Sequence, residues 1–325
     1  MNKELEIWQF AAERLKQNES VMLLVVAESL GSSPGRRGFK IIVARDDLRG
    51  SIGGGVMEVN LVEKAKFQIS NSKFQIDSTI IEQIHQKNSP SASGMICSGK
   101  QSIIFYKLNP GNLETIGKII RTLENHQPKI LQISNFKFQI TENSSDELAF
   151  QFEQQSENGF FYQEKLGYKN KLFIIGGGHC ALALSELMSK MDFHISLFDN
   201  RQELNTLDKN EFVHAKFIIE SYGKIDEFIP SGANIYVVVM TLGYESDEIV
   251  IRKLIGKNFK YFGVLGSRAK MATLLRDLRN EGFDAEKLNQ IHTPIGLPIN
   301  SQTPEEIAVS IAAEIIAVKN AKAIS

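Results

Sequence analysis

The sequence predicts an α/β protein with two domains, a mixed α+β domain at the amino terminus and a parallel-sheet domain at the carboxyl terminus. Three observations support this fold class. The chain has 325 residues, which exceeds the usual length of one domain and leaves room for two hydrophobic cores. After residue 169, short apolar runs alternate with segments of helical periodicity, as in βαβ units. Before residue 169, predicted helices and strands are mixed without this alternation. We therefore assign residues 1–168 to the first domain and 169–325 to the second.

The elements of the first domain follow from local patterns. Charges lie among the apolar residues of MNKELEIWQFAAERLKQ, which predicts an amphipathic helix. Apolar and β-branched runs predict strands at 21–26, 40–43 and 102–106, and helices are expected at 56–67 and 112–124. From 129 to 164 the chain is polar and alternating, with acidic or Asn-Gly turn signals, which predicts edge strands or a hairpin.

Composition and charge exclude two kinds of partner. There are 37 Lys and Arg against 38 Asp and Glu, so the chain lacks the positive field that binds nucleic acid. The longest apolar stretches are far shorter than the roughly 20 residues of a membrane span. The amino terminus has no continuous apolar run, so we expect a cytoplasmic protein without a membrane span. Cys97 and Cys180 fall in different domains and form no CxxC pair, so we expect no structural disulfide.

A glycine-rich turn is the strongest motif of the second domain. A buried strand is expected at 171–175, and GGGHCA follows it and leads into a helix at 182–190. In this arrangement Gly176 permits the tight turn, Gly178 allows a pyrophosphate to approach the backbone, and Ala181 keeps the helix close to the strand. The order of strand, glycine turn and helix predicts a Rossmann-type domain.

The next strands of this domain supply further candidate residues. A strand at 193–198 ends at Asp199, which lies 21 residues after Gly178 and is placed to accept hydrogen bonds from a ribose 2′-OH. Strands at 235–241 and 261–265 should end at the same crevice, where Gly266, Ser267 and Arg268 form a candidate anion contact. The alternative is a plain helix cap with Arg268 in solvent.

Two features of this crevice stay open. His179 either hydrogen-bonds a ligand or caps the helix. The predicted Rossmann-type domain is compatible with binding of a dinucleotide, but a protein can keep this fold while its ligand changes.

The first domain carries a second glycine cluster. Gly53, Gly54 and Gly55 precede the helix that carries Glu58, and successive glycines before a helix can form a backbone nest for an anion. Upstream, GSSPGRRG places two guanidiniums on a loop. The alternative for both segments is an ordinary turn with solvated charges. Cys97 lies near Lys100, whose charge could lower the pKa of the thiol toward a reactive thiolate. The alternative is that Cys97 is a buried, inert cysteine.

These residues converge on a resemblance to the XdhC/CoxI family, the maturation factors of molybdenum hydroxylases such as xanthine dehydrogenase. The resemblance covers nearly the whole chain. The segments that carry it are ESLGSSPGRRGFKIIV, GSIGGGVMEVNLVEKA, LFIIGGGHCALALSEL with LFDNR, GVLGSRAKMATLLRDL and IHTPIGLPINSQTPEEIAVSIAAEIIA.

The resemblance implies binding of molybdenum cofactor (molybdopterin), its protection during sulfuration and its delivery to a molybdenum hydroxylase apoenzyme, with a cysteine desulfurase-type sulfur donor. We also expect a homodimer, because two domains that face one ligand could share clefts between two copies. Molybdopterin combines a phosphate, a dithiolene-bound metal and a polar pterin, so it suits anion nests, guanidiniums, a carboxylate and a thiolate. The candidate cofactor-binding residues are Gly53, Gly54, Gly55, Glu58, Cys97, Gly176, Gly178, His179, Asp199, Arg201, Gly266, Ser267 and Arg268, with Cys97 as the candidate molybdenum contact.

The chain departs from the family pattern at three points. Val56 follows the first glycine triplet, where family members often have cysteine, and Leu242 follows Thr241, where many have histidine. The Cys-Gly-Gly motif is replaced by Cys97-Ser98-Gly99. Cys97 is therefore the remaining cysteine candidate of the first domain.

Two other functions are compatible with the motifs. One is an NAD(P)-dependent oxidoreductase that uses the Gly176 turn and Asp199, although no convincing catalytic acid or base accompanies them. The other is a regulatory module that senses a nucleotide without turnover. An accessory protein is favoured over a turnover enzyme.

Overall fold

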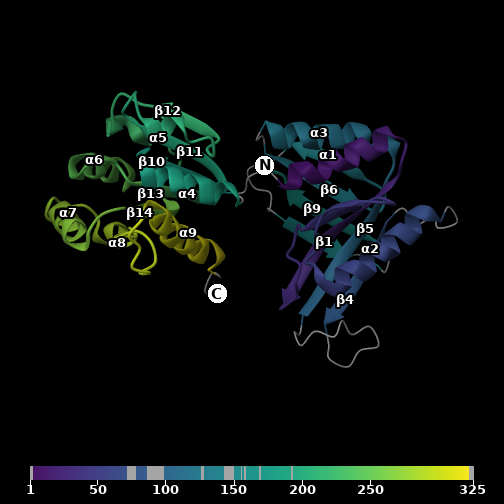
Figure 1. The fold of residues 1–325 in the computed structure, drawn as a ribbon. Coiled ribbons are helices and arrows are strands. Elements are labelled where there is room, and N and C mark those ends of the chain that lie inside the picture. The colour runs from purple at the N-terminus through teal and green to yellow at the C-terminus, as the bar shows by residue number, and fades with distance from the viewer. Residues whose placement is uncertain are drawn as a thin grey trace. The chain divides into compact units, whose positions relative to one another are not determined.

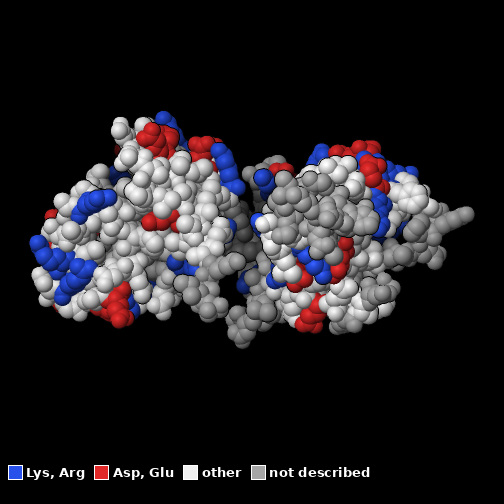
Figure 2. Space-filling model, turned by 90° about the horizontal axis from the view of Figure 1, so that it is seen from below, with Lys and Arg blue, Asp and Glu red and all other residues white. Residues whose placement is uncertain are grey.

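The computed structural model describes residues 3–71, 78–85, 99–125, 128–142, 150–154, 156, 159–167, 170–191 and 193–321. Contacts between Cα atoms divide the chain into two compact units, Met1–Gly167 and Tyr168–Ser325. The described helices are too short or too polar to cross a membrane. On the face drawn in Figure 2, acidic and basic side chains are interspersed on each unit.

The amino-terminal unit contains helices and two antiparallel sheets (Figure 1). Its elements are α1 (Lys3–Lys16), β1 (Val21–Gly31), β2 (Lys40–Val43), β3 (Leu48–Gly50), α2 (Gly55–Ser70), β4 (Ser78–His85), β5 (Gly99–Leu108), the 3-10 helix η1 (Pro110–Asn112), α3 (Leu113–Glu124), β6 (Lys129–Ser134), β7 (Phe138–Glu142), β8 (Phe150–Gln154) and β9 (Phe160–Lys165).

The larger sheet of this unit has the order β3-β2-β1-β5-β4 and is covered on both faces. Alternate residues of β1 point to opposite faces, since side chains along a strand alternate in direction. Leu23 and Val25 pack with α1, α3 and the second sheet, whereas Leu24 and Val26 pack against α2. The run VMLLVVA is therefore apolar throughout because both of its faces are buried.

A buried ion pair joins the two sheets of this unit. The second sheet has the order β7-β6-β9-β8. Lys40 of β2 lies 2.6 Å from Glu164 of β9 and 2.8 Å from Glu4 of α1. Glu164 also accepts a hydrogen bond from the Tyr162 hydroxyl. Burial alone would lower the pKa of Lys40, but the charges of Glu164 and Glu4 raise it above its ordinary value.

The carboxyl-terminal unit is a five-stranded parallel sheet with helices on both faces (Figure 1). Its elements are β10 (Asn170–Ile175), α4 (His179–Ser189), β11 (Phe193–Asp199), α5 (Asn205–Asp208), β12 (Ala215–Ile218), the 3-10 helix η2 (Tyr222–Glu227), β13 (Gly232–Val239), α6 (Tyr244–Leu254), β14 (Phe259–Val264), α7 (Arg268–Asn280), α8 (Ala285–Asn289) and α9 (Pro304–Asn320).

The strand order β12-β11-β10-β13-β14 creates a switch point between β10 and β13. The helices α4 and α9 pack on one face of the sheet, and α6, α7 and α8 pack on the other. Neighbouring strands that send their connections to opposite faces leave a crevice outside their carboxyl ends. This is where a Rossmann-type domain binds its ligand.

The fold class predicted from the sequence is confirmed, because a parallel Rossmann-like sheet occupies the carboxyl-terminal part and antiparallel sheets the amino-terminal part. The prediction omitted β3, β4 and β12. It also placed the start of the first helix of the parallel domain at residue 182, three residues later than the observed start at His179.

Candidate functional site

The carboxyl ends of β10 and β13 meet at Gly176. This glycine has a φ of +103°, a conformation that residues with a side chain rarely adopt. A Cβ atom at Gly176 would lie 2.2 Å from the carbonyl oxygen of Met240. The first glycine of the turn is therefore required by the close approach of the two strand ends.

The amino terminus of α4 opens onto free space. Gly178 is its N-cap, and no side chain of the described residues caps the first turn. A Cβ atom added at Gly178 would meet no heavy atom within 4 Å among the described residues. His179 is exposed. The unpaired backbone N–H groups of a helix start favour a negatively charged group, and here a group could approach them.

The acid at the end of β11 is fully engaged with its neighbours. Asp199 has no exposed surface, and its Oδ2 accepts hydrogen bonds from the Gly177 amide at 2.6 Å and from Arg201 Nη2 at 2.7 Å. Its Oδ1 accepts from the Arg201 amide at 2.9 Å and from Arg201 Nε at 2.8 Å. Burial alone would raise the pKa of Asp199, but these hydrogen bonds hold it below its ordinary value.

A second buried carboxylate contacts the residues that follow β13, and no motif of the sequence had indicated it. Asp247 of α6 is 1% exposed. It accepts hydrogen bonds from the Thr241 hydroxyl at 2.5 Å and the Thr241 amide at 3.2 Å. Lys270 of α7 donates to its other oxygen at 3.1 Å. The sequence signal that could have identified Asp247 is an acidic residue in the first turn of a helix that follows a buried strand.

The end of β14 has the geometry of a capped helix start. Ser267 is the N-cap of α7 and accepts a hydrogen bond from the Lys270 amide. A Cβ atom at Gly266 would lie 2.8 Å from the Met271 side chain. Arg268 is exposed, and no hydrogen bond or ion pair to it is found within the described ranges. Arg268 is therefore available to a ligand, although the cap alone accounts for Ser267.

In the amino-terminal unit, the glycine triplet is closed by a carboxylate of its own helix. Gly53, Gly54 and Gly55 all have positive φ. Glu58 Oε2 accepts hydrogen bonds from the Ile52 amide at 2.7 Å and the Gly54 amide at 3.0 Å, and from the Ser51 hydroxyl. An internal anion thus lies where the sequence predicts an anion nest, while added Cβ atoms at Gly54 and Gly55 would meet no described atom within 4 Å.

The structure brings the two loops that the sequence singled out in this unit into contact. A Cβ atom at Gly53 would lie 2.4 Å from the Gly35 amide nitrogen, and one at Gly99 would lie 2.6 Å from the Ser33 amide nitrogen. The Gly35 amide also donates to Gln101. We refer to Gly35, Gly53 and Gly99 as the glycine junction. Arg36 and Arg37 are exposed beside it.

The cysteines contribute little to the described site. Cys97 lies outside the described residues, and so does its candidate role as a molybdenum contact. Cys180, in the first turn of α4, is free and half-buried. Burial and the charge of Glu305 raise the pKa of its thiol, which disfavours the thiolate that binds metals. Within the described ranges, no group of three or more His, Cys, Asp and Glu side chains could hold a metal.

Two departures from the family pattern lie on the surface. Val56 is 59% exposed in the first turn of α2, and Leu242 is 83% exposed after β13. Val56 follows Gly55, the first residue of α2, and Leu242 precedes Gly243, the N-cap of α6. The residue at each of these two positions therefore affects the chemistry of the surface rather than the packing of the core.

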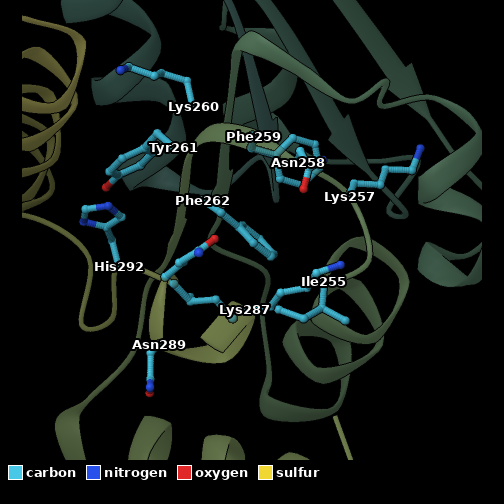
Figure 3. Close-up of a pocket in the computed structure, with 12 residues that line it drawn as sticks. Ile255, Lys257, Asn258, Phe259, Lys260, Tyr261, Phe262, Lys287, Asn289 and His292 are labelled. Atoms are coloured by element: carbon cyan, nitrogen blue, oxygen red, sulfur yellow. The ribbon is translucent and has the colours of Figure 1, made fainter. Parts of the chain in front are cut away.

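A cavity of about 380 Å³ lies away from these strand ends, beside the first half of β14 (Figure 3). Lysines line this cavity. Lys257 donates hydrogen bonds to the carbonyl oxygens of Asp226 and Ile229, and Lys287 donates one to the carbonyl oxygen of Gly256. These two amines thus hold loops together, while Lys260, which also lines the cavity, is exposed. The cavity is not a favoured candidate, because Rossmann-type domains bind ligands at the carboxyl ends of their strands.

Tyr261 and His292 lie side by side at the edge of this cavity (Figure 3). Both contact Glu314 of α9, which also accepts a hydrogen bond from the Gly296 amide at 2.9 Å. Burial alone would raise the pKa of Glu314, but its contacts with His292, Tyr261 and Gly296 lower it. This cluster fastens α9 to β14.

The fold and these strand ends define an α/β protein with a Rossmann-type unit and an open glycine turn. Residues 172–315 match the XdhC Rossmann domain, and residues 14–77 match the XdhC and CoxI family. The chain belongs to the XdhC and CoxI family. The resemblance seen in the sequence is therefore confirmed.

Two curated relatives are similar over large parts of the chain. "Uncharacterized protein YqeB" of Escherichia coli (strain K12) is 24% identical over 320 residues, which cover 97% of this chain and 47% of that protein. A Bacillus subtilis (strain 168) protein, named as a probable xanthine dehydrogenase subunit, is 30% identical over 166 residues, 50% of this chain and 46% of that protein. The chain thus spans about half the length of these relatives.

A solved structure has a similar fold. The crystal structure of a xanthine dehydrogenase from Bacillus halodurans superposes with a TM-score of 0.73 at 19% sequence identity, and the match covers 100% of this chain and 98% of that one. At this identity the similarity concerns the fold.

Proposed function

We propose that this protein is a maturation factor for a molybdenum hydroxylase of the xanthine dehydrogenase type. In this role it binds molybdenum cofactor, holds it for sulfuration by a cysteine desulfurase-type donor and delivers it to the apoenzyme, acting as a homodimer. Membership of the XdhC and CoxI family supports the proposal, and so does the name of the Bacillus subtilis relative, which refers to xanthine dehydrogenase.

The observation that carries the proposal is the open amino terminus of α4 at the switch point of the parallel sheet. The space in front of Gly178 is free of described atoms within 4 Å of an added Cβ, so a ligand group can reach the backbone donors of the helix. Such a helix start binds phosphate well. The terminal phosphate of molybdopterin is a group of this kind.

Other residues at the same edge fit a phosphate-bearing ligand. Arg201 lies beside the glycine turn through Asp199, and Arg268 is exposed at the end of β14. A guanidinium matches the oxygens of a phosphate with parallel hydrogen bonds. When bound, the cofactor would supply the molybdenum centre, while these residues would bind and orient its phosphate end.

Cofactor content tests the proposal directly. We would purify the full chain from a host that makes molybdenum cofactor, and measure bound molybdenum and pterin together with NAD(P)H. Gly178→Val should abolish co-purification of the pterin, because its side chain enters the free space before α4. Gly256→Val is the matched control, since an added Cβ there also meets no described atom within 4 Å, but the position lies in the turn after α6.

Each outcome separates the candidate functions. Molybdenum and pterin in the wild type and in Gly256→Val, but not in Gly178→Val, support the maturation factor. NAD(P)H with substrate-dependent oxidation supports an oxidoreductase and contradicts the proposal. A bound nucleotide without turnover supports a sensor and contradicts it as well. Equal pterin content in both variants removes the α4 turn from the site.

A further inference from the structure

The carboxylate of Asp199 has no acceptor capacity left. An ionised carboxylate offers about four lone-pair positions. In Asp199 these receive four hydrogen bonds, from the Gly177 amide, the Arg201 amide, Arg201 Nε and Arg201 Nη2, at 2.6 to 2.9 Å. The residue is also fully buried. A ribose hydroxyl could bind Asp199 only after the guanidinium had left.

Arg201 has unused donors where Asp199 has no unused acceptors. Its Nε and Nη2 face Asp199, and a guanidinium carries five N–H groups. Nη1 forms no hydrogen bond within the described ranges. The side chain is 32% exposed. The hydrogen bond with Asp199 raises the pKa of Arg201, so the exposed edge stays a cation.

This cation lies next to the glycine turn. Asp199 Oδ2 is 2.6 Å from the Gly177 amide nitrogen and 2.7 Å from Arg201 Nη2, so the turn and the guanidinium contact the same oxygen atom. Gly178, the next residue, begins the open end of α4. An anion in front of α4 would therefore have a fixed guanidinium as a neighbour.

We propose that Arg201 binds a phosphomonoester group, so that the carboxyl-terminal unit selects phosphorylated ligands over ligands that present an unmodified ribose diol. In Rossmann-type domains an acid with free oxygens after the second strand accepts ribose hydroxyls, whereas an arginine there accommodates a 2′-phosphate. The inference rests on the proposed function in one respect, that the ligand binds at this edge of the sheet. The phosphate could belong to a pterin cofactor or to a nucleotide.

The test compares matched probes by isothermal titration calorimetry on the full chain. One pair is metal-free molybdopterin and its dephosphorylated form, and the other is adenosine 2′,5′-bisphosphate and 5′-AMP. The phosphorylated member of one pair should bind about 10- to 100-fold more tightly, as for loss of one or two charge-assisted hydrogen bonds. The pair that shows the preference identifies the source of the phosphate.

Variants assign the preference to Arg201. In Arg201→Met the ratio of the two affinities should fall to about one, and Arg201→Lys should restore part of it because the charge returns without the planar fork. Arg276→Met is the matched control, since the Arg276 side chain is 65% exposed on α7, and it should keep the full ratio. Circular dichroism confirms that each variant is folded.

Two results would overturn the inference. Either neither phosphorylated probe is preferred by the wild type, or the preference survives in Arg201→Met. Failure of the proposed function gives a different pattern. In that case molybdenum and pterin do not co-purify with the wild type, while the nucleotide pair can still show a preference that depends on Arg201.

Discussion

Replacing Lys40 by methionine should strongly destabilise the amino-terminal unit. Lys40 is 5% exposed and Glu164 is 1% exposed, and their charged groups are 2.6 Å apart. Methionine fills a similar volume but removes the lysine charge beside the buried carboxylate of Glu164. Glu4 loses the same partner, but 27% of its side chain is exposed and can be hydrated.

The expected loss is about 3–5 kcal/mol in the free energy of unfolding, the range found when one partner of a buried ion pair is removed. The separation of 2.6 Å corresponds to a direct attraction of about 6 kcal/mol at an effective dielectric constant of about 20. The desolvation of the lysine offsets part of that attraction. Lys40→Met combined with Glu164→Gln should recover more than half of the loss, because the buried charge is removed.

The single tryptophan of the chain provides the assay. Trp8 lies in α1 and is fully buried in the core of the same unit. Its fluorescence during urea denaturation therefore follows the amino-terminal unit, whereas circular dichroism follows both. A loss below about 1 kcal/mol for Lys40→Met would refute the reasoning, as would a double variant no more stable than the single one.

Three further predictions concern the carboxyl-terminal unit. Gly176→Ala should lower the melting temperature and reduce the free energy of unfolding by about 2–4 kcal/mol, because alanine there would have a positive φ and would clash with Met240. Gly178→Ala should change the free energy of unfolding by less than about 1 kcal/mol. Equal effects of the two substitutions would contradict the geometry. Glu314→Gln should cost about 1–2 kcal/mol in calorimetry, and an unchanged transition would argue against its role in holding α9. Because the pKa of Asp199 is lowered, its stabilisation is present above its ordinary pKa and is lost as the pH falls below about 4. Asp199→Asn should therefore unfold with a weaker acid dependence, measured by circular dichroism.

The parallel sheet was predictable because its signals are local. Each central strand is a short apolar run, and the glycine turn that opens α4 follows β10 directly in the sequence. The same locality explains the omission of β12, whose residues Lys216, Phe217 and Ile218 are exposed at the sheet edge. An exposed edge strand has little of the apolar pattern that marks a buried one.

The chemistry of the site was less predictable, because it depends on which donors meet which acceptors. The spacing from Gly178 places Asp199 correctly at the end of β11, but spacing does not reveal that Arg201 occupies its oxygens. In the same way Asp247 and Lys270 are 23 residues apart and meet only because α6 and α7 cover one face of the sheet. The buried role of Lys40 was likewise hidden, since a polar residue at the start of a strand is usually exposed.

The glycine junction has a consequence for engineering the amino-terminal unit. Gly35, Gly53 and Gly99 each lie where an added methyl group would come within 3 Å of backbone atoms of another loop. A sequence from a relative cannot be grafted into one of these loops alone unless it keeps the small residue at the crossing. Chimaeras that aim to change specificity should therefore exchange the three segments as a set.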